Sequence, residues 1–277
     1  MKVSKNLTIF FKKRQIYAIF ILVWLNMEVM YSVGRIGGEK MRIQFEFAID
    51  KMPLAYRLGM LSMVKEMIKK GSPAYFEKVF QAQSQKMKPF SFATYIKDLQ
   101  IEKDEIYGQS LHLTVSSPSY EFIMYLMNGS EREHTYRYKD YSFTLKRKRL
   151  LPKPPTFSSN VLFKTLSPLL IEDKEKSPIL STDTDFEKEL NYYASLLVEE
   201  IYQRPLQRPI NVLHTSMKKV VIKEELHQVE KGPIYLTGNQ GLIQLEGDPV
   251  DLQAIYDSGL GRRRSLGFGL LEIEGVN

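Results

Sequence analysis

Apolar and polar residues alternate in MRIQFEFAI, residues 41–49, and this period of two predicts a β-strand with one buried face. The next segment, residues 53–71, changes to the helical period. Leucine, valine and isoleucine recur every three or four residues there, and methionines at 60, 63 and 67 form a second stripe. The segment predicts an amphipathic helix with Pro53 in its first turn and Gly71 at its end. We interpret the methionine stripe as core rather than as a binding surface.

The pattern that follows completes one supersecondary unit. The expected elements are a short helix over 72–83, strands over 88–96 and 105–115, a helix over 117–129 opened by Ser117 and Pro118, and a strand or hairpin over 134–150. The order is strand, helix, two strands, helix, strand. This is the βαββαβ order of a ferredoxin-like fold.

The same order recurs after LPKPPT, residues 151–156, which has the composition of a proline-stiffened linker. The expected elements are a strand over 161–171, a helix over 185–202, a strand or hairpin over 210–222, a hairpin over 233–247, a helix over 248–259 and a strand over 267–273. The fold class is therefore α+β. We expect tandem ferredoxin-like domains over residues 41–150 and 157–277, the second with a glycine-rich loop over 259–269.

The first forty residues do not continue these patterns. Basic residues precede the apolar run IYAIFILVWL, residues 16–25, which is too short to cross a bilayer as a helix. A signal peptide fits this start, but residues 26–40 offer no small-residue cleavage site. Back-translation of GGEKM, residues 37–41, gives a purine-rich tract that resembles a bacterial ribosome-binding sequence just before the codon of Met41. We therefore expect translation to start at Met41 and residues 1–40 to be a leader outside the native protein.

Composition narrows the classes of partner and chemistry. The chain has 277 residues, and its net charge of +7 favours an acidic partner, most often nucleic acid. It has no cysteine, which excludes disulfides, thiolate nucleophiles and sulfur-ligated zinc and fits a cytoplasmic location. The four histidines are scattered without the spacing of metal ligands. We expect no metal site and no cofactor.

The loop GLGRRRSLGFG, residues 259–269, carries the clearest candidate chemistry. It follows a predicted helix and precedes a strand, whereas the dinucleotide fingerprint follows a strand and opens a helix, and the phosphate-binding loop with a Gly-Lys-Ser/Thr ending is absent. Its glycines let backbone N–H groups approach phosphate oxygens, and three guanidinium groups stand beside them. The loop suits a polyanionic backbone. The alternative is a tight turn with solvated arginines.

A second basic cluster lies in LKRKRLLPK, residues 145–153. Strand geometry places Lys146 and Lys148 on one face and Arg147 and Arg149 on the other, in a segment that also bears tyrosines at 136, 138 and 141. Interleaved basic and aromatic side chains suit RNA, through phosphate pairing and base stacking. The alternative is a charged edge strand that discourages aggregation.

Four segments together resemble a known family. GLGRRRSLGFGLLEI, residues 259–273, is a glycine-rich loop that ends in Ser-x-Gly-Phe-Gly and runs into a final strand. It resembles the C-terminal signature of the CRISPR-associated protein six family, the endoribonucleases of the RAMP superfamily that cut the long repeat transcript into guide RNAs. MRIQFEF at the first strand, KPFSFA at 88–93 and FKTLSPLLI at 163–171 agree with it in order and spacing. The family's tandem ferredoxin-like fold matches the architecture expected here.

The resemblance implies a metal-independent attack of a ribose 2′-hydroxyl on the adjacent phosphate. Lys88, just before the phenylalanine of KPFSFA, matches a lysine that the family often keeps, and we assign it provisionally to charge stabilisation; a solvated strand-end residue is the alternative. The family's histidine and tyrosine would fall near residues 80–83 and at Met63, where this chain has neither. The general base is therefore unassigned. The candidate RNA-binding residues are Lys86, Gly259, Gly261, Arg262, Arg263, Arg264, Ser265, Gly267, Gly269, Lys146, Arg147, Lys148 and Arg149.

Three hypotheses remain at this point. The first is a repeat-RNA endoribonuclease. The second is a weakly active or inactive RNA-binding subunit of a CRISPR defence complex, in which other effector subunits are partners, and a more distant third is a ferredoxin-like protein adaptor. The four histidines, at 112, 134, 214 and 227, fit structural or solvent-exposed roles better than catalytic ones. No membrane partner is expected, and a homodimer is compatible with the sequence.

Overall fold

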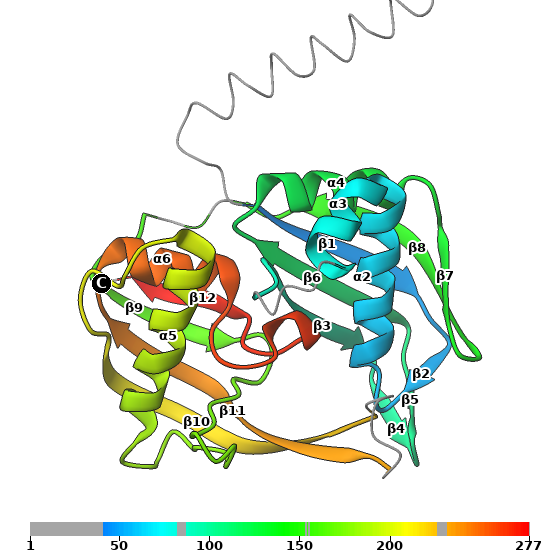
Figure 1. Cartoon of the computed structure of the whole chain (residues 1–277). Coiled ribbons are helices and arrows are strands. Elements are labelled where there is room, and N and C mark those ends of the chain that lie inside the picture. Colours follow the sequence, from blue (N-terminus) through cyan, green and yellow to red (C-terminus); the bar gives the residue numbers. More distant parts are fainter. Residues whose placement is uncertain (1–40, 82–86, 153, 155, 226–231, 277) are drawn as a thin grey trace, which may run out of the picture. The chain divides into compact units, whose positions relative to one another are not determined.

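A computed structural model describes residues 41–81, 87–152, 154, 156–225 and 232–276 (Figure 1). The predictions for the leader, Lys86 and His227 lie outside these residues. All described residues belong to one compact unit, Lys40–Asn277. The predicted division into two domains at residues 151–156 stays a prediction, because both sheets of the fold lie within that unit.

The first half folds around a five-stranded antiparallel sheet in the order β3-β6-β1-β8-β7. The strands are β1 (Met41–Ala48), β3 (Ser91–Lys97), β6 (Ser110–Ser117), β7 (Thr135–Tyr138) and β8 (Tyr141–Leu150). With the fourth strand taken as β8, the order is 4-1-3-2, which confirms the ferredoxin-like fold predicted for this half. The segment predicted as a strand or hairpin is the hairpin β7–β8.

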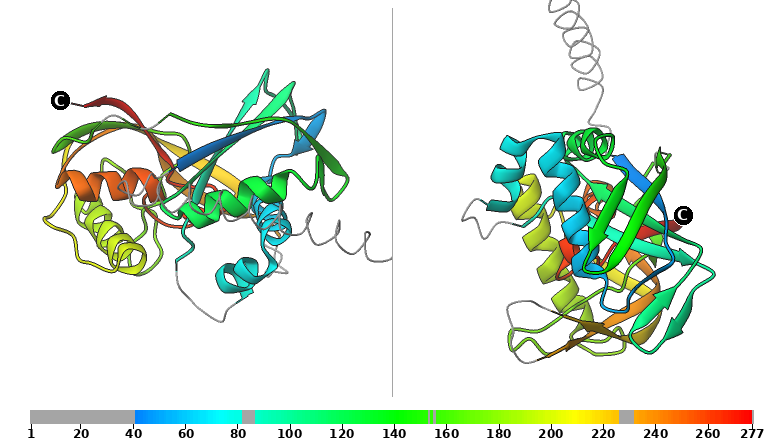
Figure 2. Two further views of the ribbon diagram at one scale, coloured as in Figure 1. Left: turned by 90° about the horizontal axis from the view of Figure 1, so that it is seen from above. Right: turned by 90° about the vertical axis from the view of Figure 1, so that its right-hand side faces the viewer.

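Helices α2 (Arg57–Gly71) and α4 (Tyr120–Ser130) cover one face of this sheet (Figure 2). The alternating residues Ile43, Phe45 and Phe47 are fully buried, as are Met60 and Met67 of α2. The core interpretation of the methionine stripe is therefore confirmed. Polar positions alternate with these residues along β1, so the opposite sheet face carries polar side chains such as Gln44 and Glu46.

Two helix starts differ from the predictions. Pro53 belongs to the short strand β2 (Lys51–Pro53), which pairs with β5 (Glu105–Tyr107) beside β4 (Gln100–Glu102), so α2 begins only at Arg57. Helix α4 is capped by Ser119, whose hydroxyl accepts from the Phe122 N–H, because Ser117 is the last residue of β6. The predicted short helix is α3 (Pro73–Phe76) followed by a π-helical turn, η1 (Glu77–Gln81).

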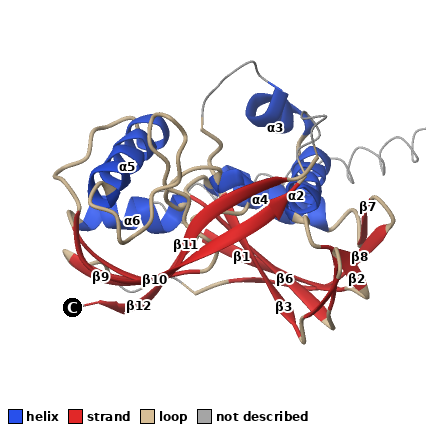
Figure 3. Ribbon diagram, turned by 90° about the horizontal axis from the view of Figure 1, so that it is seen from below, coloured by secondary structure: helices blue, strands red, loops and turns tan. Residues whose placement is uncertain are grey.

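The second half repeats the topology with a four-stranded sheet in the order β10-β11-β9-β12, again 4-1-3-2. Its elements are β9 (Asn160–Thr165), α5 (Phe186–Tyr202), β10 (Asn211–Glu224), β11 (Ile234–Glu246), α6 (Pro249–Ser258), η2 (Arg264–Leu266) and β12 (Leu271–Val276). In both halves the helices lie on one side and the strands on the other (Figure 3). The tandem ferredoxin-like fold is thus confirmed.

Two strand predictions in this half are corrected. Strand β9 ends at Thr165 rather than at residue 171, because the chain bends at Leu166 and Ser167, directly before Pro168. Residues 234–246 form one long strand instead of a hairpin, since β11 pairs with β10 along its whole length and with β9 at one end. The resulting β10–β11 ribbon extends well beyond β9 towards the first half (Figure 1).

Buried arginines join the halves. The Arg42 guanidinium donates to the Tyr256 carbonyl (2.5 Å) and to Glu272 (3.2 Å), and it stacks 3.5 Å from the centre of the Tyr256 ring. Arg57, at the start of α2, pairs with the fully buried Glu224 at the end of β10 over 2.8 Å. Such buried pairs fix geometry because breaking one leaves an uncompensated charge in the interior.

Apolar contacts reinforce this junction. Leu58 and Leu61, on the second face of α2, pack against a small cluster formed by Leu170, Leu236, Leu266 and Phe268. Helix α2 therefore packs its methionine stripe in the core of its own half and its leucines against the second half. Both apolar stripes of the sequence are used for packing.

Candidate functional site

The glycine-rich loop, residues 259–269, links α6 to β12 and packs against β3 of the first half. The Leu260 N–H donates to the Gly269 carbonyl (2.9 Å) and closes the loop, and the Arg262 N–H donates to the Leu170 carbonyl (2.9 Å). Gly267 has a φ of +80°, and a Cβ there would lie 2.5 Å from the Phe92 ring. The glycines thus let the loop fold tightly against its own chain. The amides of residues 260 and 262 are engaged internally and are not open to phosphate, contrary to the chemistry expected of them.

The side chains of the three consecutive arginines differ in burial and in their partners. Arg264 is only 5% exposed, donates to the Ser258 carbonyl (2.6 Å), and has its pKa lowered by burial to about 10. Arg262 forms an ion pair with Glu172, and Arg263, at a φ of +57°, is half-buried. Because the Arg264 guanidinium binds groups of the chain itself, its predicted phosphate contact does not fit the structure. Its role is to hold the loop.

Lys88 lies directly beside this loop. The second Arg264 nitrogen contacts the Met87 sulfur (3.2 Å) and the Lys88 carbonyl (3.4 Å), and the Met87 N–H donates to Glu200 of α5 (2.9 Å). The Lys88 ammonium donates to the Val79 carbonyl over 2.5 Å. Burial, and the nearby charge of Lys65, lower the pKa of Lys88. Two sequence-predicted elements, Lys88 and the loop arginines, are therefore brought together by the fold.

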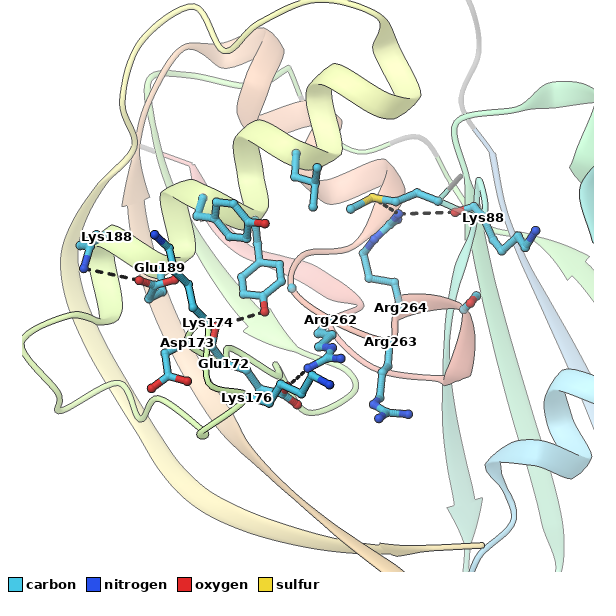
Figure 4. Close-up of a pocket in the computed structure, with 16 residues that line it drawn as sticks. Lys88, Glu172, Asp173, Lys174, Lys176, Lys188, Glu189, Arg262, Arg263 and Arg264 are labelled. Atoms are coloured by element: carbon cyan, nitrogen blue, oxygen red, sulfur yellow. Dashed lines mark hydrogen bonds and ion pairs between the residues drawn. The ribbon is translucent and has the colours of Figure 1, made fainter. Parts of the chain in front are cut away.

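They share a pocket of about 620 Å³ between the loop, α5 and the segment that follows β9 (Figure 4). Seven basic and three acidic side chains line the pocket, an excess of four positive charges. The lining residues are Met87, Lys88, Glu172, Asp173, Lys174, Lys176, Lys188, Glu189, Tyr192, Tyr193, Leu196, Gly261, Arg262, Arg263, Arg264 and Ser265. Volume and charge fit a polyanionic ligand with an apolar part.

The α5 side of this pocket was not predicted from the sequence. Residues 172–176 have the composition of a surface loop, and the apolar residues of α5 at helical spacing indicate only its core-facing stripe. Lys188 and Tyr192 lie one helical turn apart, off that stripe, and this spacing is the signal that the sequence does carry. What it could not indicate is that the loop 259–269 packs opposite them.

The second basic cluster does not join the pocket. Lys148 faces the helices, donates to the Met127 carbonyl (3.3 Å) and the Ser130 hydroxyl (3.1 Å) at the end of α4, and forms an ion pair with Glu131. It stabilises the negative end of that helix, contrary to the predicted RNA contact. Arg149 lies on the open sheet face and donates to Gln44.

The remaining basic members of the cluster are exposed, and one of its tyrosines is not available for stacking. Lys146 and Arg147 are exposed on β8. Tyr136 is buried in the core at the edge of the Phe47 ring, which excludes it from base stacking. The Tyr141 hydroxyl donates to Glu105 (3.0 Å).

No described histidine lines the pocket. His112 lies on the open face of the first sheet, 5.7 Å from the Tyr95 ring, with Ser110 3.1 Å from its Nε2 atom. Within the described ranges no group of three His, Cys, Asp or Glu side chains is arranged to hold a metal ion. No helix among the described residues is long and apolar enough to cross a membrane.

The fold has known counterparts. Residues 151–273 match the family model described as CRISPR associated protein Cas6, C-terminal. The chain is 25% identical over 252 residues to the CRISPR-associated endoribonuclease Cas6 1 of Methanocaldococcus jannaschii, covering 84% of this chain and 92% of that protein.

Solved structures agree in fold. A CRISPR associated protein Cas6 superposes with a TM-score of 0.66 at 23% identity, over 86% of this chain and all of that one. A Cas6-related protein from Pyrococcus furiosus gives 0.72 at 18% identity, over 85% and 98%. A RAMP protein described as binding different RNA substrates gives 0.70 at 17%, over 85% and 100%.

Two ferredoxin-like folds in tandem are the architecture that this chain shares with these solved Cas6 and RAMP structures. The family model and the Methanocaldococcus relative point to the same family. Residues 151–273 match the C-terminal part of Cas6, and the chain as a whole is similar in sequence to a Cas6 protein.

Proposed function

We propose that this protein is an endoribonuclease that binds the CRISPR repeat transcript and cuts it into guide RNAs. The observation that carries the proposal is the shared pocket, where Lys88 and the arginines of the glycine-rich loop meet with an excess of positive charge. The name of the Methanocaldococcus relative, an endoribonuclease, supports it. The substrate is repeat RNA, whose phosphates match the charge of the pocket.

The proposed chemistry is attack of a ribose 2′-hydroxyl on the adjacent phosphate, without a metal ion. The new P–O bond closes a 2′,3′-cyclic phosphate while the bond to the 5′-oxygen breaks, and a proton passes to that oxygen. Because its pKa is lowered, the Lys88 ammonium is a stronger acid than an ordinary lysine, which suits proton donation to the leaving oxygen or stabilisation of charge on phosphorus. It must exchange its bond to the Val79 carbonyl for the RNA. The general base stays unassigned.

Arg262 and Arg263 are the loop residues best placed to bind phosphate. Both line the pocket, and the Nε of Arg263 has no hydrogen-bond partner within the described residues. Arg262 is held by Glu172, so that its guanidinium is positioned before RNA arrives. Ser265 and Gly261 line the same wall. Arg264 supports them by fixing the loop on Met87 and Lys88.

A second candidate function is an RNA-binding subunit with little or no cleavage activity, which acts with other subunits of a defence complex. The observation that favours it is the hydrogen bond of the Lys88 ammonium to Val79, together with the lack of histidine among the described pocket residues. Such a site would bind phosphate but supply no evident base.

Incubation with the cognate repeat RNA in EDTA separates the two functions. One discrete cut that leaves a cyclic phosphate, and that a single 2′-deoxy substitution at the cut abolishes, supports the endoribonuclease. Tight binding without product supports the subunit. Absence of binding at low salt contradicts both.

A further inference from the structure

We propose that the α5 wall of this pocket is a nucleotide subsite, in which one unpaired base of the RNA stacks on Tyr192. This inference rests on the proposed function, because the subsite lies in the pocket proposed there to bind repeat RNA. Tyr192, Lys174, Lys176 and Lys188 were not among the residues predicted from the sequence, whereas Arg262 was. The ligand class is a single-stranded ribonucleotide.

Tyr192 is an aromatic side chain without a packing role. The buried residues of α5 form a stripe that Tyr192 does not join, and its side chain is 56% exposed. The neighbouring Tyr193 packs edge-on against it, with ring centres 5.4 Å apart at 72°. Tyr193 is in turn fixed by its hydroxyl, which donates to the Glu172 carbonyl over 3.1 Å. The Tyr192 ring is thus supported on one side and free to stack on the other.

Basic groups stand where the phosphates of a stacked nucleotide would lie. Lys188 is one helical turn before Tyr192 on the same face of α5, and its side chain is 73% exposed. Lys174 and Lys176 approach from the segment after β9, and Arg262 comes from the glycine-rich loop (Figure 4). Aromatic and basic groups on facing walls form the combination that binds single-stranded nucleic acid.

The dimensions of the pocket favour one splayed base over a duplex. About 620 Å³ lies within the range of sites that enclose a small ligand. Tyr193, Leu196 and Met87 give this pocket an apolar lining, which suits the face of a base but not a paired helix. Sequence-specific RNA recognition commonly uses unstacked bases of this kind.

The test uses the full chain and its cognate repeat RNA. Fluorescence anisotropy compares the wild type with Tyr192→Ala and Tyr192→Phe, and with Tyr235→Ala as a matched control. Tyr235 of β11 is 65% exposed and lies outside the pocket, so its loss tests a nonspecific effect of removing a surface aromatic. We expect Tyr192→Ala to bind about 5- to 150-fold more weakly, as loss of one base–aromatic stack predicts, and the other two variants to stay within about threefold of the wild type.

A second readout locates the base. 2-Aminopurine is placed at successive positions of the repeat, and its fluorescence should be quenched at one position by the wild type and by Tyr192→Phe but not by Tyr192→Ala. If the wild type binds RNA while Tyr192→Ala binds equally well and no position depends on Tyr192, the subsite is wrong and the proposed function stands. If the wild type binds no repeat RNA, both are wrong.

Discussion

The Arg264 guanidinium donates to the sulfur of Met87 over 3.2 Å, although the two residues are 177 positions apart in the chain. This contact fastens the glycine-rich loop of the second half to the segment that carries Lys88 in the first. Glu200 of α5 accepts a second hydrogen bond, from the Met87 N–H. The segment that carries Lys88 is therefore held at two places in the second half, the glycine-rich loop and α5. The pocket therefore depends on both halves of the chain.

Replacement of Arg264 by methionine should lower the free energy of unfolding by about 2–4 kcal/mol, since it leaves the buried Ser258 carbonyl without its donor. Arg263→Ala, at a half-buried neighbour, should change it by less than about 1 kcal/mol. Urea denaturation measures both. Equal losses in the two variants would show that Arg264 does not have the structural role assigned to it.

The charge contribution of the loop is tested separately with Arg262→Ala combined with Arg263→Ala. Each phosphate contact on single-stranded RNA contributes about 0.7 to the slope of log affinity against log salt, so the double variant should flatten the slope by about 1.4. The control removes Lys69 and Lys78, an equal charge change on α2 and η1 outside the pocket. A slope that falls equally in the control would contradict a phosphate contact by these arginines.

Lys148→Met should destabilise the protein by about 1–2 kcal/mol, because Lys148 binds the end of α4 through Met127 and Ser130. Lys146→Met, two residues earlier and exposed, should have little effect on stability. The midpoint of thermal unfolding is measured for both variants, and it should be lower for Lys148→Met. A lower midpoint for Lys146→Met would refute the role of Lys148 at the end of α4.

The buried Glu224 makes stability depend on pH. Burial raises its pKa above the ordinary 4.5, despite the opposing effect of Arg57. At low pH the Glu224 carboxyl is protonated in both the folded and the unfolded protein, and it costs no stability. As the pH rises above 4.5 the carboxyl ionises in the unfolded protein first, so the cost to the folded protein grows until the pH passes the raised pKa. Relative to Glu224→Gln, the wild type should therefore lose stability as the pH rises above 4.5. A difference that stays constant as the pH rises would exclude a raised pKa.

Periodicity predicted the elements but not where the basic side chains point. The alternation in β1 and the two stripes of α2 determine which faces are buried, so both ferredoxin-like units could be predicted. Arg262, Arg263 and Arg264 are adjacent in sequence, yet a left-handed residue and a 3-10 turn send only Arg264 into the interior. Lys148 could equally have faced RNA, because its helix-end partners become adjacent only in the folded protein. The spacing of Lys188 and Tyr192 off the apolar stripe of α5 is a signal in the sequence, but it could not indicate a pocket, because the opposite wall comes from distant segments.

Cleavage of repeat RNA in the pocket shared by Lys88 and the loop arginines can be measured directly. Single-turnover cleavage rates in EDTA compare the wild type with Lys88→Met, and binding is measured on RNA that carries a 2′-deoxy sugar at the cut. We expect one cut with a cyclic phosphate end by the wild type, and at least about 100-fold slower cutting by Lys88→Met with affinity within about threefold. Equal cleavage rates for the two proteins would show that Lys88 does not take part in the reaction.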